Sequence, residues 1–454
     1  MSAFSSLNRR AFLKSLAATG ALGSMSPAQL LANTGNAPTW QNWSGNQSAT
    51  PRQLVYATDE SMVRDTIRNS TGTLRAFGGS HSFSGIVPTD DTLISLEPMA
   101  GLRGADGNTF RYGGGTRLAM ASAMAYEQGY SFTNEPDINL QSLAGAIATS
   151  THGTGLGLQS LSGQVDSLRL VTPDGEPLEL TAADGDHFLA ACCNVGALGV
   201  VTEIGFRHDP AYRLEEHTWT LPLRDAMDFV AKEKDNFRHI EFFAFPLGDQ
   251  AIVKTMEITS DTQDSPTRAD DNELLEMVSK LAMQAGWLTP TLQKLSTLFV
   301  EDSRYVGPAN KVFANHRTVR FNEMEYTVPA EQGIACLEEV CAAIRQHDIN
   351  VFFPIEFRYV AADDNLLSMF HQQSGASLSI HQYFEQDYQP LFDVVEPILR
   401  RYAGRPHWGK IHNLGRRELG ELYPAFDRFQ AVRKELDPQG RMLNPHLKLS
   451  LIHI

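Results

Sequence analysis

The chain has 454 residues, of which 42% are hydrophobic and 20% are charged, and it carries a net charge of −15. This length can bury the cores of two domains, and the composition is that of an ordinary soluble globular protein. The acidic balance argues against a nucleic-acid-binding protein, whose surface needs a basic patch. The charge does not select a substrate.

The first residues read as a targeting segment. LNRRAFLKSLAATGALGSM has paired arginines and a short, glycine-broken apolar run, which does not form a stable membrane span. Arg9, Arg10 and the Ala-Phe-Leu-Lys that follows resemble the twin-arginine export signal; a Sec signal or a disordered tail is the alternative. The resemblance implies a signal peptide over 1–32, the twin-arginine export machinery as a partner, and a periplasmic or secreted protein. Proteins often take that route because a cofactor must be installed in the cytoplasm.

Many short strands and turns fill the region from Trp40 to about residue 210. The pattern predicts a strand and a helix over 53–70, and strands within 73–77, 92–96 and 109–113. A helix follows and ends at Gly129, and the segment 165–180 reads as a hairpin around Asp174-Gly175. A helix, a glycine turn and a strand complete the region over 186–207. We therefore expect a mixed α+β unit here.

A second α+β region follows, roughly over 211–409. Helices are predicted over 223–237 and 336–349, and the segment 260–273 is a polar loop. Four segments read as strands: 239–247, 250–258, 321–329 and 351–360. The tail is expected to hold one helix and a terminal loop.

The four cysteines show no zinc-site pattern, because the chain has no C-x-x-C spacing. Cys192 and Cys193 are adjacent and poorly placed to pair with each other. We interpret these two, with Cys336 and Cys341, as packing residues; a Cys336–Cys341 disulfide is the alternative. No metal site is predicted.

Two glycine-rich loops carry the first chemical signal, from Phe77 to Gly85 and from Ala144 to Gly157. Glycine lets a backbone approach a ligand closely, and successive backbone N–H groups form an anion-binding nest. Such loops suit a large flat cofactor with a diphosphate; the alternative is two ordinary loops and a tightly packed small-residue helix. The G-x-S-x-G, H-E-x-x-H, P-loop and G-x-G-x-x-G motifs are absent from the sequence.

Five motifs in order resemble a known flavoprotein family: FGGSHSF, SLAGAIATSTHGTG, GALGVVTEIGF, PIEFRYVAADD and RPHWGKIHNL. Together they are similar to the D-arabinono-1,4-lactone oxidase and alditol oxidase group of vanillyl-alcohol-oxidase-type flavoproteins, while the segment around 260–304 shows no match. The resemblance implies an α+β fold with a PCMH-type FAD-binding domain of two subdomains over 40–210. It also implies a substrate (cap) domain over 211–409 and a C-terminal segment, 410–454, that returns to the FAD domain. The expected cofactor is FAD and not a nicotinamide.

The resemblance assigns residues to this cofactor. His81 occupies the position that carries a covalently bonded flavin in the family, and an imidazole nitrogen is a competent nucleophile. Further positions are implied to contact the flavin or its diphosphate: Gly78, Gly79, Ser80, Ser82, Ser142, Gly145, Thr149, Ser150, Thr151 and His152. Gly199, Val200 and Val201 match a strand that contacts the adenine through its backbone.

The motif PIEFRYV has strand-like alternation, which places Glu356 and Arg358 on one face. An exposed ion pair of little energetic value is the alternative, but the preceding Phe-Phe-Pro indicates a partly enclosed site. The resemblance implies that Arg358 and Lys410 bind the reacting hydroxyl of the substrate and that Glu356 orients Arg358. It places His381 in the substrate pocket.

These features predict an exported FAD-dependent oxidoreductase that oxidises an alcohol carbon of a polyol, sugar or aldonolactone. The hydride would go to flavin N5, the hydroxyl proton would be lost, and the positive side chains would stabilise the developing alkoxide. Dioxygen or another acceptor would then take the electrons. The alternatives are a periplasmic carbohydrate-binding protein without turnover and a nicotinamide-linked dehydrogenase.

Overall fold

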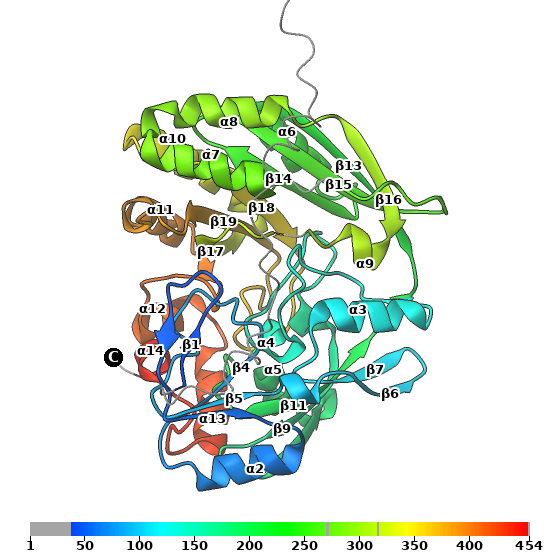
Figure 1. Ribbon diagram of the computed structural model, residues 1–454, viewed down its shortest axis with the longest axis vertical. Helices are drawn as coiled ribbons and strands as arrows, with labels where there is room; N and C mark the ends of the chain where they lie inside the picture. Colours follow the sequence, from blue (N-terminus) through cyan, green and yellow to red (C-terminus); the bar gives the residue numbers. More distant parts are fainter. Residues whose placement is uncertain (1–37, 269–271, 316, 453–454) are drawn as a thin grey trace, which may run out of the picture. The chain divides into compact units, whose positions relative to one another are not determined.

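The structure is a computed structural model that describes residues 38–268, 272–315 and 317–452. The predicted twin-arginine segment, 1–32, lies outside the described residues. Residues Thr39–Ile454 form one unit of the chain. This unit combines helices with parallel and antiparallel sheets (Figure 1), as the predicted α+β class requires.

A small parallel sheet of three strands, in the order β3-β5-β4, carries the first glycine loop in the connection from β4 to β5. Its helix α2 starts at Asp59, whose side chain accepts a hydrogen bond from the N–H of Met62 at 2.9 Å. β4 ends at Phe77, so the glycine loop leaves the carboxyl end of a parallel strand, where α/β sheets commonly bind ligands. The elements are β3 (Gln53–Tyr56), α2 (Glu60–Asn69), β4 (Leu74–Phe77) and β5 (Thr92–Ser95).

An antiparallel sheet in the order β10-β9-β11-β7-β6 forms the second part of this region, and β9 and β10 form the predicted hairpin. In the turn of this hairpin, Gly175 has φ +85°, which glycine adopts without strain. The strands are β6 (Leu102–Asp106), β7 (Thr109–Gly113), β9 (Val165–Val171), β10 (Pro177–Thr181) and β11 (Val200–Arg207). The helices are η2 (Glu97–Met99), α3 (Leu118–Glu127), α4 (Leu143–Ala148), η3 (Leu161–Gln164), η4 (Ala182–Asp184) and α5 (Asp186–Cys192). Two short pairs complete it: β1 (Trp40–Gln41) with β2 (Ser48–Ala49), and β8 (Tyr130–Ser131) with β12 (Asp209–Pro210).

The remaining strands form one antiparallel sheet of eight strands, in the order β16-β13-β15-β14-β18-β19-β17-β20. Its neighbours are often distant in sequence, since β14 lies beside β18 and β17 beside β19. The strands are β13 (Arg213–Pro222), β14 (His239–Phe245), β15 (Gln250–Thr259), β16 (Ser303–Pro308), β17 (Phe321–Pro329), β18 (Ile355–Val360), β19 (Gly375–Tyr383) and β20 (Arg405–Pro406).

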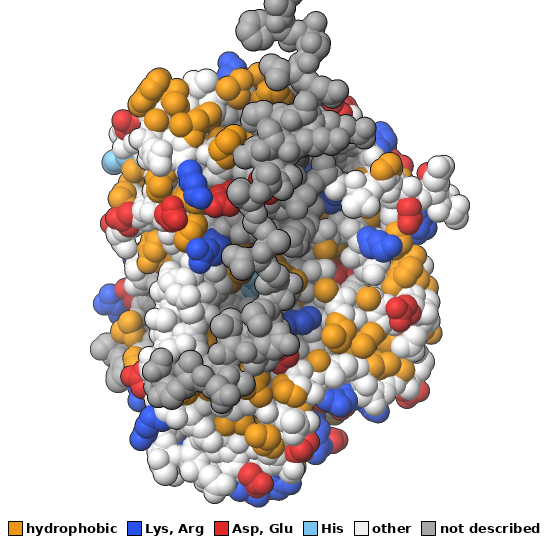
Figure 2. Space-filling view, viewed as in Figure 1, with side chains coloured by type: hydrophobic (Ala, Val, Ile, Leu, Met, Phe, Trp, Pro, Cys, Tyr) orange, Lys and Arg blue, Asp and Glu red, His pale blue; other side chains and the backbone are white. Residues whose placement is uncertain are grey.

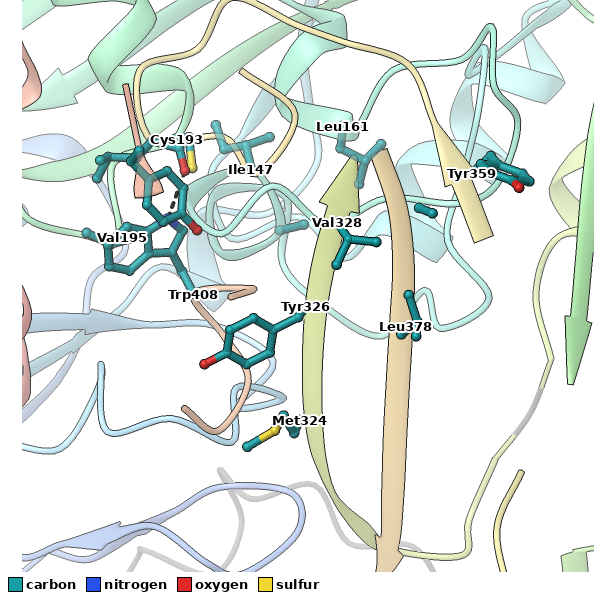
Figure 3. Packing of buried hydrophobic residues seen from close by; sticks show 14 of the residues in the cluster. Ile147, Leu161, Cys193, Val195, Met324, Tyr326, Val328, Tyr359, Leu378 and Trp408 are labelled. Atoms are coloured by element: carbon teal, nitrogen blue, oxygen red, sulfur yellow. Dashed lines mark hydrogen bonds between the residues drawn. The ribbon is translucent and has the colours of Figure 1, made fainter. Parts of the chain in front are cut away.

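One face of this sheet is apolar, because side chains alternate along each strand. Met324, Tyr326 and Val328 of β17 are buried in one cluster with Leu378 of β19 and with Trp408 (Figure 3). The opposite face carries the polar residues between them and faces the glycine loops. The helices of this region are α6 (Leu223–Glu233), α7 (Asn272–Gln284), η5 (Gly286–Leu288), α8 (Thr289–Leu298), α9 (Ala309–Val312), η6 (Ala330–Gln332), α10 (Gly333–Gln346) and α11 (Gln389–Arg401).

The C-terminal segment differs from the prediction, because it holds three helices and not one. They are α12 (Arg416–Leu422), α13 (Phe426–Leu436) and α14 (Pro445–Leu451). Tyr423 is extended, with ψ 105°, because the following Pro424 disfavours a helical conformation in the residue before it. Pro445 starts α14 at a position where its missing N–H costs nothing, and Asn444 caps that helix. The Asn444 side chain also donates to the Gly85 carbonyl at 2.8 Å, which ties this segment to the first glycine loop.

All four cysteines are buried and free, as packing residues would be. The alternative Cys336–Cys341 disulfide is therefore wrong. Both residues lie on α10, five positions apart, so their side chains point about 140° away from each other around the helix axis.

Hydrophobic side chains gather near the top of the face shown in Figure 2, above a surface where acidic and basic groups are interspersed. Trp287 of η5 and Phe299 at the end of α8 are 81% and 79% exposed. No helix within 38–268, 272–315 or 317–452 has both the length and the hydropathy to cross a bilayer.

Candidate active site

A cavity of about 250 Å³ lies between the glycine loops and the polar face of the eight-stranded sheet. The residues of the loop side that line it are Gly78, Gly79, Ser80, His81, Ser82, Ser142, Gly145, Thr149, Thr151, His152, Gly199 and Val201. The residues of the sheet side that line it are Glu323, Glu325, Glu356, Arg358, His381, His407 and Lys410. The structure thus brings the predicted Glu356, Arg358, His381 and Lys410 into one space with most of the predicted loop residues.

Two predicted residues do not line this cavity. Ser150 is fully buried, and its hydroxyl pairs with that of Ser162 at 2.8 Å. The side chain of Val200 packs into an apolar cluster beside the parallel sheet. Their neighbours Thr149, Thr151 and Val201 line the cavity in their place.

The first glycine loop lies so close to residues 140–142, which precede the second glycine loop, that no side chain fits at Gly78 or Gly79. A Cβ atom on Gly78 would lie 1.8 Å from the Ser142 hydroxyl oxygen, and one on Gly79 would lie 2.7 Å from the Leu140 carbonyl oxygen. Ser142 is also the N-cap of α4, and its hydroxyl accepts a hydrogen bond from the Gly145 N–H at 3.3 Å. The loop side of the cavity is therefore shaped mainly by backbone.

His81 is the titratable group of the first loop. Burial, together with the cations of Arg117 and Lys410, lowers the pKa of His81 to about 4. The ring is therefore neutral at neutral pH and keeps a nitrogen lone pair. That state is the one in which an imidazole acts as a nucleophile.

Arg75 shows that the loop side fits an anionic cofactor. The residue lines the cavity, and its guanidinium donates to the carbonyl oxygens of Ile86, Val195, Gly196 and Met442. It forms no ion pair within 4 Å in the described part of the chain, although the Asp437 carboxylate acts on it from a greater distance. Burial lowers the pKa of Arg75 to about 9. A buried positive charge without a paired carboxylate favours an anion nearby, and the diphosphate of FAD supplies one.

The sheet side of the cavity is built by three neighbouring strands. Glu323 and Glu325 of β17 lie opposite His381 and Ser379 of β19, and Glu356 of β18 lies opposite Ser379 on its other side. Residues two apart on a strand share a face, so the same alternation that buries one face against helices collects charged groups on the other.

Arg358 is the central cation of this face, although only 7% of the residue is exposed. It donates to Ser379 Oγ at 3.0 Å, to Glu325 Oε1 at 3.3 Å and to the His152 carbonyl at 3.5 Å, and it lies 3.7 Å from Glu356 Oε2. Burial alone would lower the pKa of Arg358, but Glu356 and Glu325 outweigh it and raise this pKa. Glu325 accepts a hydrogen bond from the guanidinium and Glu356 lies within ion-pair distance of it, so both carboxylates contact this cation.

Lys410 is the second cation, and it bridges both sides of the cavity. Its ammonium group pairs with Glu323 and lies 5.0 Å from the centre of the Phe83 ring, which belongs to the first loop. Glu323 also lies 3.6 Å from the His381 ring. Burial would raise the pKa of Glu323, but Lys410 and His381 lower it to about 2.

His152 links the second loop to the sheet. Its Nε2 lies 2.7 Å from Glu325 Oε1, and both side chains are about 1% exposed. Its Nδ1 lies 2.9 Å from the Gly153 carbonyl oxygen. The two ring nitrogens therefore connect the second loop, through Gly153, to Glu325 of β17. Burial would raise the pKa of Glu325, but His152 and Arg358 hold it well below its usual range.

His407 has a fixed tautomer, because its Nδ1 accepts a hydrogen bond from the Gly409 N–H at 3.0 Å. Burial lowers the pKa of His407 to about 3, so the ring is neutral and carries its proton on Nε2. A neutral N–H donor thus lines the cavity beside Lys410.

Buried polar atoms without a hydrogen-bond partner indicate that this site binds a polar ligand. Glu356 Oε1, Arg358 Nε and Gln141 Oε1 belong to cavity-lining residues and have no hydrogen-bond partner in the described part of the chain. Buried polar groups are nearly always paired, so a bound molecule or water must supply the missing partners.

Glu323, Glu325, Ser379 and His407 were missed by the sequence reasoning. A signal for the two carboxylates exists in FNEMEYTVP, where glutamates alternate with large apolar residues on a strand. Charged residues at every second position of a buried strand indicate a functional face. His407 lies three positions before Lys410 in the motif RPHWGKIHNL, but no spacing pattern in the sequence indicates its role.

The family model described as D-arabinono-1,4-lactone oxidase matches residues 204–449, and one described as FAD binding domain matches residues 51–181. The L-gulono-1,4-lactone dehydrogenase of Mycobacterium tuberculosis is 36% identical over 424 residues, which cover 90% of this chain and 98% of that protein. The alditol oxidase of a Streptomyces species is 26% identical over 421 residues, which cover 90% and 97%.

The solved structure of cholesterol oxidase from Brevibacterium sterolicum superposes with a TM-score of 0.76 over 91% of this chain and 96% of that one, at 15% identity. This likeness shows the fold alone, and it confirms the PCMH-type FAD-binding domain with an α+β cap. The FAD-binding match confirms FAD in place of a nicotinamide. The chain belongs to the D-arabinono-1,4-lactone oxidase family and is an FAD-dependent oxidoreductase that acts on CH–OH groups.

Proposed function

We propose that this oxidoreductase oxidises one CH–OH carbon of an aldono-1,4-lactone, with an open-chain alditol as the second candidate substrate. The observation that carries the proposal is the polar face beneath the glycine loops, where Arg358 and Lys410 are matched by Glu323, Glu325 and Glu356. A charge-matched pocket with free acceptors and donors suits a neutral polyhydroxy compound. The greater identity to a protein named for L-gulono-1,4-lactone favours the lactone over the alditol.

The residues of the chain have distinct tasks in this reaction. FAD bound against the glycine loops would accept the hydride from the substrate carbon at its N5 atom. Arg358 and Lys410 bind the substrate oxygen and stabilise the negative charge that develops on it. Glu325 and Glu323 hold these two cations in place, and Glu356 Oε1 is available to accept a hydrogen bond from a substrate hydroxyl.

Aromatic residues keep bulk water away from this site. Phe321 and Phe353 line the cavity, and the ring of Phe83 stacks on that of Phe321 at 5.8 Å. Excluding water lowers the local dielectric, which strengthens the interaction of two fixed cations with a developing alkoxide.

A substrate panel tests the proposal. Purified holoenzyme is mixed with L-gulono-1,4-lactone, other aldonolactones and alditols, while oxygen uptake and dye reduction are followed in parallel. We expect turnover of a lactone, and the ratio of the two signals assigns the electron acceptor as dioxygen or another compound. Flavin-loaded enzyme that turns over no lactone and no alditol would refute the proposed substrate class.

We also propose that the flavin is covalently attached through His81. Support comes from the neutral ring in a glycine turn and from the family resemblance of FGGSHSF. The protein is denatured and run on a gel, and the flavin should stay with the chain as a fluorescent band. His81→Ala should hold FAD only non-covalently, with a lower flavin potential. Complete loss of flavin from the denatured wild type would refute the attachment.

Export by the twin-arginine route to the periplasm or beyond is a further proposal, supported by the Arg9-Arg10 motif. Replacing both arginines by lysine keeps the charge but removes the recognition feature. We expect folded, flavin-loaded enzyme to accumulate in the cytoplasm of cells that make the double variant. Normal export of that variant would point to another route.

A further inference from the structure

The segment from Trp40 to Gln47, named here the N-terminal clasp, lies against the loop that carries His81. Its ends are joined by the pairing of β1 with β2, where Trp40 lies opposite Ala49. Inside it, Asn42 Oδ1 accepts hydrogen bonds from the backbone N–H groups of Gly45 and Gln47, both at 3.0 Å. The clasp is therefore a preformed turn and not a loose end of the fold.

The clasp holds the two sides of His81 by hydrogen bonds. The N–H of Trp43 donates to the Ser80 carbonyl at 2.8 Å, and the indole N–H of Trp40 donates to the Ser80 hydroxyl at 3.0 Å. On the other side, the Asn42 amide donates to the Ser82 carbonyl at 3.0 Å.

The same contacts continue one residue further along the loop. Asn46 Nδ2 donates to the Phe83 carbonyl at 3.0 Å, and Gln47 Nε2 donates to the same oxygen at 3.3 Å. Ser80 before His81, and Ser82 and Phe83 after it, thus have polar groups held by hydrogen bonds from the clasp.

Ser80 needs this support, because its φ is +57°. A residue other than glycine in the left-handed region persists only where its surroundings fix it, and two hydrogen bonds from the clasp do so here. The direction in which the chain enters His81 depends on this torsion. The clasp therefore sets the position of the imidazole.

Trp43 also faces the imidazole itself. Its ring centre lies 5.7 Å from that of His81, with 33° between the planes. The indole is held in turn by edge contacts with Phe83 and Phe321, at 6.2 and 5.1 Å. The Trp43 side chain thus limits the rotation of the His81 ring and also contacts the eight-stranded sheet at Phe321.

We propose that the clasp is a positioning element for flavin attachment, with Trp43 holding the imidazole plane and the Ser80 carbonyl, and Trp40 holding the Ser80 hydroxyl. The inference rests on the proposed bond between His81 and FAD. A nucleophile must meet its target atom in a narrow range of geometry, and a displacement of about 1 Å can slow such a step about 100-fold. The clasp residues act on the attachment through His81 and touch no reacting atom.

The test uses the full chain, produced in riboflavin-limited cells and then supplied with a saturating concentration of FAD. Bound flavin is measured in the native protein, and covalent flavin is measured over time after acid precipitation. The variants are Trp43→Ala, Trp43→Phe and Trp40→Phe. Trp287→Phe is the matched control, because that indole is 81% exposed and lies outside the clasp.

We expect Trp43→Ala to bind FAD normally and to attach it about tenfold more slowly or worse. Trp43→Phe should recover part of the rate, since it keeps an aromatic face. Trp40→Phe loses one hydrogen bond and should be about fivefold slower. The control should match the wild type.

Wild-type attachment rates in all three clasp variants would overturn the inference and leave the His81 bond standing. A parallel loss of non-covalent FAD would also overturn it, because the clasp would then act only on folding of the loop. A wild-type chain that never attaches flavin would refute the His81 bond itself, and the inference with it.

Discussion

The two sides of the cavity are built by different means. On the loop side, close backbone contacts at Gly78 and Gly79 shape the site. On the sheet side, buried charged side chains shape it, with Arg358 and Glu325 at the centre. A substitution on the loop side should therefore change the space that is available to the flavin, and with it the flavin loading. A substitution on the sheet side should instead leave a buried charge without its partner.

Substitutions on the sheet side should have larger effects than substitutions on the loop side. Each buried cation on the sheet side has at least one carboxylate partner, and removing one member of a buried pair leaves the other charge without compensation. On the loop side, Arg75 has backbone carbonyl groups as its partners, and the residues from Gly78 to Ser82 carry no ionised side chain.

Glu325→Ala should give the largest effect on stability. It leaves His152 and Arg358 without their shared carboxylate, which should lower the free energy of unfolding by about 3–5 kcal/mol. Chemical denaturation of the FAD-loaded protein measures the loss. Glu331→Ala is the control, because Glu331 is 81% exposed and pairs only at the surface with Lys234, so its loss should stay below about 1 kcal/mol. Equal losses in the two variants would contradict a functional charge network.

Arg358→Ala and Lys410→Ala should each keep full flavin content but reduce flavin about 100-fold more slowly with substrate, because a cation at the developing alkoxide is lost. Arg358→Lys should recover little, since one ammonium group cannot reach Glu325, Ser379 and the His152 carbonyl together. Anaerobic stopped-flow absorbance measures the rate. Wild-type rates in both alanine variants would leave these residues as structural ion pairs.

Gly78→Ala should lower FAD loading about tenfold, because the new methyl group would overlap the Ser142 hydroxyl. Adding Ser142→Gly to that variant should restore part of the loading, since it removes the overlapping side chain. Gly157→Ala is the control in the second loop, where a Cβ meets no atom within 4 Å. Flavin absorbance per chain is the readout, and normal loading of Gly78→Ala would show that the loops can move apart.

The smallest predicted effect is a pH dependence at Glu323. Its pKa falls from 4.5 to about 2 in the folded protein, so its contribution to stability is complete above about pH 4.5 and is lost as the pH falls toward 2. The difference in unfolding temperature between the wild type and Glu323→Gln should therefore be constant from pH 7 to 5 and narrow below that. A difference that does not change with pH would show that Glu323 does not interact with the charges of Lys410 and His381.

The sequence was informative where the determinants are local. The glycine loops, the hairpin around Gly175 and the alternation at Glu356 and Arg358 follow from residues close together in the chain, and the structure contains all three. The C-terminal helices were misjudged because Pro424 was not taken as a break.

The sheet side could be predicted only in part, because its pairings join distant segments. Glu325 lies 33 positions before Arg358 and 173 after His152, and these three residues meet only once β17, β18 and β19 have formed one sheet. No local pattern states which strands become neighbours. A glutamate on a buried strand can be identified from sequence, but its partner cannot.

The most direct test of the account is anaerobic mixing of wild-type holoenzyme with L-gulono-1,4-lactone while the absorbance of the oxidised flavin is recorded. The account predicts that the lactone bleaches the flavin in a single turnover and that Arg358→Ala slows this bleaching about 100-fold at unchanged flavin content. A purified protein without flavin, or a bound flavin that stays oxidised with every aldonolactone and alditol, would contradict it.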